Sequence, residues 1–536
     1  MTVSIRNKNP SSTPDYVDAL AALSADRSRV STFSWPATVA LLGVALLALL
    51  AGLITRPALR DNALSAAADA IGNTGEIMVG VLAIAITVVA IVVELAATRY
   101  THRVTALFLR DRVNLTLLGL YTVTSLLCLW TSFVSPTRTP AGDPLLWLTL
   151  ALISLSLASL LPYFAYVLGF ISPLNIIDRL LQRGALAIEA ATGAPISLRL
   201  KAFRAVAATT AEDLHDVARK ALDQSDRSVA MASVTALFEL LSHYADRRSA
   251  LPRAWFHIDS DFDTDPDFVS LEDDALVPIR DHGLWFELKV YRQAIAVLSA
   301  AVPGLRDLAS LIAIETRRYG IERTGSAAER ELCVRAYNSY LRVCINAADA
   351  RSTYYLLNQF RRLGQTLLRW PEERHSIHIA EHLRYYGQLA HERNQPFLLE
   401  VTAYDLVNLL LAAKDAAPGS DHSVTDAMLD VLLELDLQIR DERDEPSLLG
   451  VRRAQLQLAA RLLTAGDEAR VQRIVTDLAD ESQQRLVGIC RALENEQRSS
   501  FWELTERGVN FGYLEPEHRA HLQALLARID AARSDA

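Results

Sequence analysis

Two groups of side chains in this sequence have the types and spacing of metal ligands. The first group is acidic and follows the alternate spacing of a calcium-binding loop: Asp261, Asp263, Asp265, Asp267 and Glu272. Phe268 supplies the hydrophobic residue expected at the eighth position, but Pro266 stands where the loop needs a glycine at positive φ. The alternative, which the sequence favours, is a solvated acidic loop held by the neighbouring aromatic residues Trp255, Phe256, Trp285 and Phe286.

The second group consists of three histidines, His375, His378 and His382, beside Glu381. Their spacing places three imidazoles near one face of a helix, and three such ligands suffice to hold zinc. Amphipathic surface helices also collect histidines without any metal, and the sequence has no HExxH motif. A metal site therefore stays the alternative here, and no cofactor is expected.

A third pattern runs along one face of an apolar stretch and contains only small or polar residues: Glu76, Gly80, Ala83, Thr87, Ala90, Glu94, Ala97 and Thr101. The 17 residues from Ile77 to Val93 are uncharged. On a helix the two flanking carboxylates lie about 27 Å apart, roughly the thickness of the hydrocarbon core of a bilayer. This predicts a membrane-spanning helix with one face that meets protein or water.

Two interpretations of this face stay open. Small residues at this spacing let membrane helices pack closely, and acids at the ends of a span lie where a carboxylate costs little. Alternatively, copies of the face surround a shared axis in a homo-oligomer. Rings formed by Glu76 and Glu94 would then concentrate cations at the two mouths of a channel.

The elements that position these groups divide the chain of 536 residues into parts. Four apolar segments, at about 37–55, 76–98, 113–135 and 145–171, are long enough to span a membrane. We therefore expect a polar tail at 1–36 and a four-span domain at 37–174. In the third span, a polar face is expected to pack against other helices and hydrogen-bond to them: Asn114, Tyr121, Ser125, Cys128 and Ser132.

Basic residues gather on the side of the membrane that holds both termini: Arg6, Lys8, Arg27, Arg29, Arg99, Arg103, Arg110, Arg112, Arg179 and Arg183. The other side has only Arg56, Arg60 and Arg138. The positive-inside rule predicts a multi-pass protein of the cytoplasmic (inner) membrane with both termini in the cytoplasm. The residues Arg99, Arg103, Arg110 and Arg112 either bind anionic lipid headgroups or serve only to fix topology.

The stretch LAATRYTHRVTALFLRDRVNLTLLGLY, Leu95 to Tyr121, resembles a bacterial family of predicted integral membrane proteins of unknown function. Residues Arg103, Phe108, Asp111 and Gly119 match the family's pattern, whereas His102 stands where the family has proline. The resemblance covers about residues 60–180. It implies a four-span topology and no established activity.

The remainder reads as successive amphipathic helices separated by short Pro and Gly breaks. We expect an all-α chain with a helical linker region at 175–250, an acidic and aromatic loop region at 251–286 and a cytoplasmic α-solenoid-like domain at 287–536. Ser326 with Glu329 predicts a capped helix start. Solenoids mostly bind partners or self-assemble.

The net charge of −9 argues against nucleic acid as a partner, and the four cysteines form no CxxC pair. The sequence has no nucleotide-binding or catalytic motif, so we do not expect an enzyme. The predicted function is a membrane scaffold or sensor whose helical domain binds a cytoplasmic protein or drives homo-oligomerisation. The alternative is a homo-oligomeric cation channel.

Overall fold

The computed structural model describes residues 61–99, 111–134, 144–170, 172–193, 198–258, 265–302, 304–416, 423–437 and 445–535. Within these residues the fold is helical, and the only β interaction is an isolated antiparallel bridge between Ser500 and Val509. The all-α prediction is therefore confirmed. Contacts divide the chain into two compact units, Met1–Ala190 with Ser197–Lys220 and Ala191–Ile196 with Ala221–Ala536.

Three helices of the first unit are long and apolar enough to cross a membrane: α3 (Asp61–Arg99), α5 (Arg112–Val134) and α6 (Pro144–Phe170). Their apolar windows, Glu76–Leu95, Val113–Trp130 and Leu148–Val167, correspond to the second, third and fourth predicted spans. The first predicted span, at 37–55, lies outside the described residues.

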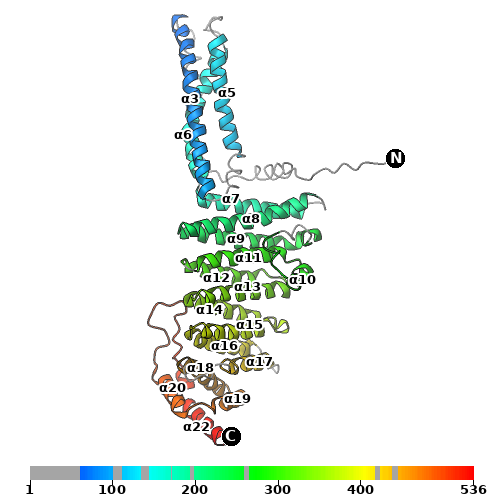
Figure 1. The fold of residues 1–536 in the computed structure, drawn as a ribbon, viewed down its shortest axis with the longest axis vertical. Helices are drawn as coiled ribbons and strands as arrows, with labels where there is room; N and C mark the ends of the chain where they lie inside the picture. Colours follow the sequence, from blue (N-terminus) through cyan, green and yellow to red (C-terminus); the bar gives the residue numbers. More distant parts are fainter. Residues whose placement is uncertain are drawn as a thin grey trace, which may run out of the picture. The chain divides into compact units, whose positions relative to one another are not determined.

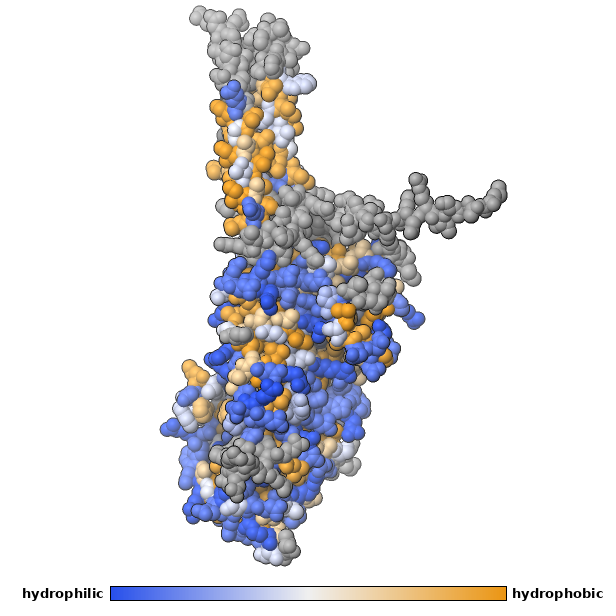
Figure 2. Space-filling view, viewed as in Figure 1, coloured by the Kyte–Doolittle hydropathy of each residue, from blue (hydrophilic) through white to orange (hydrophobic). Residues whose placement is uncertain are grey.

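These helices pack through a small interior core. Ala85 and Val89 of α3 meet Tyr121 of α5, together with Tyr163 and Val167 of α6. Many other apolar side chains point outward, for example Ile84, Leu126 and Leu161. The space-filling view shows this hydrophobic covering on the three helices (Figure 2). An apolar exterior over this length is the surface that lipid requires.

Helices α5 and α6 are also joined by polar side chains. The Tyr163 hydroxyl donates to Oδ1 of Asn114 at 2.6 Å, and the Thr124 and Ser156 hydroxyls lie 3.0 Å apart. Four residues of the predicted face of the third span, Asn114, Tyr121, Ser125 and Cys128, are buried, as a helix contact requires. The side chain of the fifth, Ser132, lies outside the described ones. Two further helices of this unit, α7 (Pro173–Thr192) and α8 (Leu198–Asp223), are linked by an ion pair between Arg183 and the buried Asp213.

The second unit begins with α9 (Arg227–Arg247), α10 (Asp273–His282), α11 (Trp285–Ala301), α12 (Arg306–Glu322), α13 (Ala327–Asn346), α14 (Ala350–Leu367), α15 (His375–Glu392) and α16 (Phe397–Ala416). From α11 to α16 each helix packs against the next helix and against the one after it, so the helices stack in chain order (Figure 1). We call this stack the helical array.

The array continues with α17 (Ser423–Leu433), α18 (Glu445–Thr464), α19 (Glu468–Leu478), α20 (Gln483–Asn495), α21 (Pro516–Arg519) and α22 (Leu522–Asp535). Its interior is aliphatic with several buried aromatic side chains, among them Tyr337 and Phe360, whose rings stack 5.1 Å apart. The side chain of Ser326 caps α13 by accepting from the Glu329 backbone N–H, as the sequence predicts.

The acidic and aromatic region is more helical than expected, because residues Asp273–His282 form α10. Its aromatic residues do anchor it. The side chains of Trp255, Trp285 and Phe286 are buried, and the indole N–H of Trp285 donates to the Trp255 carbonyl at 2.8 Å. Burial of these large rings offsets the entropy cost of ordering the loop.

Residues 496–515, between α20 and α21, reach back along the array, and we call them the C-terminal strap. The guanidinium of Arg507, in the strap, lies in the interior of the array. It donates hydrogen bonds to both carboxylate oxygens of the buried Asp405, at 2.6 and 3.0 Å. The Phe511 ring stacks on Tyr404 with a centroid distance of 4.4 Å. The strap therefore belongs to the packed structure of α14 and α16, although Arg507 follows Asp405 by 102 residues and Tyr354 by 153.

Candidate functional sites

The small and polar face of α3 lies on the surface of the three-helix group. Glu76, Gly80, Ala83, Thr87, Ala90 and Glu94 are all exposed. The opposite face carries the buried residues Met78, Ala85 and Val89. The two remaining members of the pattern, Ala97 and Thr101, lie outside the described side chains.

The middle of this face offers little polarity. The Thr87 hydroxyl donates to the Ala83 carbonyl at 2.8 Å, within the helix. Gly80, Ala83 and Ala90 add no polar side-chain atoms, so close packing against another helix leaves no side-chain donor without a partner there. The carboxylates stand only at the two ends, at Glu76 and Glu94.

The stretch that carries the family pattern is described only in part. Side chains of Arg99, Arg103, Arg110 and Arg112 lie outside the described ones. Asp111 caps α5, because its Oδ2 accepts from the backbone N–H groups of Val113 and Asn114. The same oxygen accepts from the Tyr166 hydroxyl of α6 at 2.6 Å. Asp111 therefore fixes where α5 starts and ties that start to α6.

The acidic loop contacts a cation on a neighbouring helix that sequence spacing did not reveal. Nζ of Lys289, on α11, donates to Oδ2 of Asp265 and Asp267, and its side chain is fully buried. Gln293 also donates to Asp267. Asp261 and Asp263 lie outside the described residues, and Glu272 is exposed at the start of α10. Asp265 and Asp267 thus serve to neutralise a buried ammonium group.

The histidine cluster is arranged differently from the sequence prediction. One ligand atom each from His375, His378 and Glu331 lies within 4.8 Å of the other two, and His382 is not in this group. Glu331 belongs to α13 and the histidines to α15, so spacing along one helix could not identify the carboxylate. The pKa of His382 is lowered, mainly by burial.

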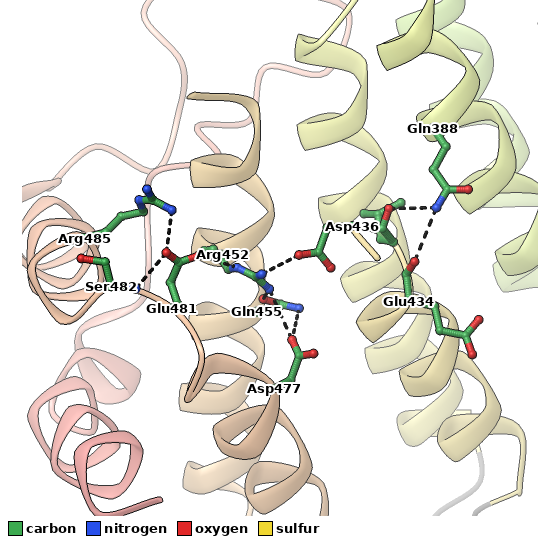
Figure 3. A network of polar contacts seen from close by, with 10 residues as sticks. Gln388, Glu434, Asp436, Arg452, Gln455, Asp477, Glu481, Ser482 and Arg485 are labelled. Atoms are coloured by element: carbon green, nitrogen blue, oxygen red, sulfur yellow. Dashed lines mark hydrogen bonds and ion pairs between the residues drawn. The ribbon is translucent and has the colours of Figure 1, made fainter. Parts of the chain in front are cut away.

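A polar network crosses the C-terminal half of the array (Figure 3). Arg452 of α18 forms ion pairs with Asp436, Asp477 and Glu481 at 2.5, 3.3 and 3.0 Å, and it also donates to Gln455. The guanidinium of Arg452 thereby joins α18 to Asp436, which follows α17. It also joins α18 to Asp477 in α19 and to Glu481, which follows α19. These contacts fix the positions of the helices that they join.

Comparisons with known proteins support the membrane assignment. The family described as "Predicted membrane protein (DUF2254)" matches residues 29–232, which confirms the resemblance stated for the segment around α3 to α6. No curated protein matches the chain. A solved structure titled "Circular tandem repeat protein with novel repeat topology and enhanced subunit contact surfaces" is similar over 88% of this chain and 97% of its own, with 13% identity and a TM-score of 0.34.

Proposed function

We propose that this protein is a non-catalytic scaffold or sensor of the cytoplasmic (inner) membrane. In this proposal the membrane helices anchor the chain, and the helical array acts as an α-solenoid that binds a cytoplasmic protein partner. The observation that carries the proposal is the successive packing of α11 to α16, each helix on the next and on the one after. Such an arrangement produces extended surfaces that suit partner binding.

The C-terminal strap supports a role in binding. Trp502, Leu504 and Val509 are exposed there, whereas Arg507 and Phe511 fix the strap to the array. Exposed large apolar side chains on an anchored segment are a usual feature of protein interaction sites. The array surface that Figure 2 shows is largely hydrophilic, with smaller apolar patches.

Self-association would use the small and polar face of α3. This face is exposed in the three-helix group and lacks a bulky side chain between Gly80 and Ala90 along its stripe. Tight helix packing between copies would cover it, since small residues allow close approach of backbones. The channel alternative places the same face around water, with Glu76 and Glu94 at the mouths. The internal hydrogen bond of Thr87 favours packing.

Orientation is part of the proposal. We propose that both termini and the array lie in the cytoplasm. The arginines between α3 and α5, together with those that follow α6, support this orientation by the positive-inside rule. In the proposed role the protein uses neither a nucleic acid nor a cofactor.

Photocrosslinking in intact cells tests partner binding. A photoreactive residue in place of Trp502 should give a higher-mass adduct, because its position on the strap is exposed. The same residue in place of Glu372, also exposed, is the control for random collisions. Equal adducts at both positions, or none at Trp502, would contradict binding through the strap.

A further inference from the structure

His375, at the start of α15, lies buried between two carboxylates. Only 6% of the residue is exposed. Its Nδ1 lies 3.3 Å from Oε2 of Glu331, and its Nε2 lies 3.3 Å from Oε2 of Glu373. Within the described residues neither ring nitrogen has a partner with hydrogen-bond geometry. Because buried polar atoms are nearly always bonded, at least one of these nitrogens calls for a further ligand.

Glu373 is the carboxylate that is held in place. Arg330 binds both of its oxygens, at 2.8 and 2.5 Å, and the guanidinium lies 4.3 Å from the centroid of the Trp370 ring. This arrangement favours the tautomer in which Nε2 of His375 carries the proton and faces Glu373. A neutral imidazole then presents its lone pair at Nδ1, toward Glu331.

A lone pair that faces a carboxylate oxygen is repelled by it unless a cation lies between them. The separation of 3.3 Å between Nδ1 and Oε2 of Glu331 is longer than a charge-assisted hydrogen bond. It equals the distance of about 3.3–3.4 Å between neighbouring ligands of a tetrahedral zinc ion with bonds of about 2.0–2.1 Å. The distance therefore suits two ligands of one metal ion.

His378 completes a set of three ligands. It follows His375 by three residues on α15, and the ligand atoms of Glu331, His375 and His378 all lie within 4.8 Å of one another. Glu331 is positioned from its other oxygen, which accepts from Nε of Arg335 at 3.0 Å. Two imidazoles and one carboxylate are a donor set typical of zinc and neighbouring divalent transition metals.

We propose that Glu331, His375 and His378 bind a divalent transition-metal ion of the zinc type. Nδ1 of His375 is the ligand atom, Glu373 orients the imidazole through Nε2, and a water molecule takes the fourth position. The ion joins α13 to α15 and so stiffens the array at that level. This site is independent of the proposed scaffold function.

Metal binding to the purified full-length protein in detergent tests the site. After chelator treatment and dialysis against Zn²⁺, bound metal is measured by mass spectrometry and the Tm is recorded. Co²⁺ serves as a spectroscopic probe of tetrahedral coordination. We expect about one ion per chain and a Tm that rises with metal concentration, because the ion binds only the folded site. Absence of Zn²⁺ and Co²⁺ binding at pH 7.5 would overturn the proposal.

Variants distinguish this ligand set from the alternative set of His375, His378 and His382, which the spacing along α15 predicts. Glu331→Gln and His378→Ala should each weaken Zn²⁺ binding tenfold or more, whereas His382→Ala should leave it unchanged. Glu373→Gln should weaken binding by about 10–100-fold, as loss of an orienting carboxylate does. If Glu331→Gln does not yield folded protein, His378→Ala decides. Loss of binding in His382→Ala, or its retention in His378→Ala, would overturn the ligand assignment.

Discussion

The ammonium group of Lys289 lies 2.7 Å from Oδ2 of Asp265 and 2.9 Å from Oδ2 of Asp267, and no part of the lysine side chain is exposed. These two aspartates belong to the pattern that resembles a calcium loop in the sequence. In the folded chain Lys289 of α11 balances their negative charge. Calcium would have to displace a buried ammonium group, which would then be left without a counter-ion.

We therefore expect millimolar calcium to leave the Tm of the full-length protein unchanged. Lys289→Met should lower the free energy of unfolding by about 3–5 kcal/mol, because it removes the cation from two partly buried carboxylates. Glu272→Gln, at the exposed end of the same pattern, should change it by less than about 0.5 kcal/mol. Thermal unfolding with and without calcium measures all three effects. A calcium-dependent rise in Tm would contradict this assignment.

Substitution of Arg452 should lower the free energy of unfolding more than substitution of most other arginines of the array. Arg452→Met leaves Asp436, Asp477 and Glu481 without their shared cation, so we expect a loss of about 3–5 kcal/mol. Arg452→Lys should restore only part of the lost stability, because an ammonium group lacks the planar set of N–H donors of a guanidinium. Denaturant unfolding of the purified protein provides the measurement.

The matched control for Arg452 is Arg473. Arg473 pairs with Asp430 on the exposed surface, so Arg473→Met should cost less than about 1 kcal/mol. Equal losses for the two methionine variants would show that the network of Figure 3 contributes nothing beyond a surface ion pair.

The buried Glu287 predicts a pH dependence of stability. Burial raises its pKa from the ordinary value of 4.5 to about 7, although Arg248 lies 2.7 Å away and opposes this shift. A carboxyl with a raised pKa in the folded state stabilises the fold below pH 4.5. That contribution is lost as the pH rises through about 7. The difference in Tm between the native protein and Glu287→Gln should therefore fall from pH 5 to pH 8. A constant difference over this range would contradict the shift.

The sequence predicted the features that depend on the pattern of one helix. Apolar length identified α3, α5 and α6, and the polar residues Asn114 and Tyr121 marked the face of α5 that packs on α6. It could not identify Tyr163 as the partner of Asn114, because spacing says which face is polar and not what meets it. For the same reason the sequence missed Lys289 and Glu331, because each lies on a helix that does not contain the residues it contacts.

Membrane orientation can be measured by cysteine labelling. All four native cysteines, Cys128, Cys333, Cys344 and Cys490, are buried, so background labelling should be low. Arg60→Cys and Arg138→Cys should react with an impermeant maleimide in intact cells, whereas Arg103→Cys should react only after permeabilisation. Labelling of Arg103→Cys in intact cells would reverse the orientation and remove the array from the cytoplasm.

The central claim is a membrane scaffold that self-associates through the small and polar face of α3. Its most direct test is the particle mass of the protein in lipid nanodiscs, compared with Ala83→Leu and Ala90→Leu. We predict an oligomer for the native protein and a shift to monomers for both variants, because leucine blocks close helix approach. Ile84→Ala, at an exposed apolar position of α3 outside this face, should keep the oligomer. If the two leucine variants stay oligomeric and lose cation flux, the result supports the channel alternative. A native monomer, or leucine variants that stay oligomeric, would contradict self-association by packing of this face.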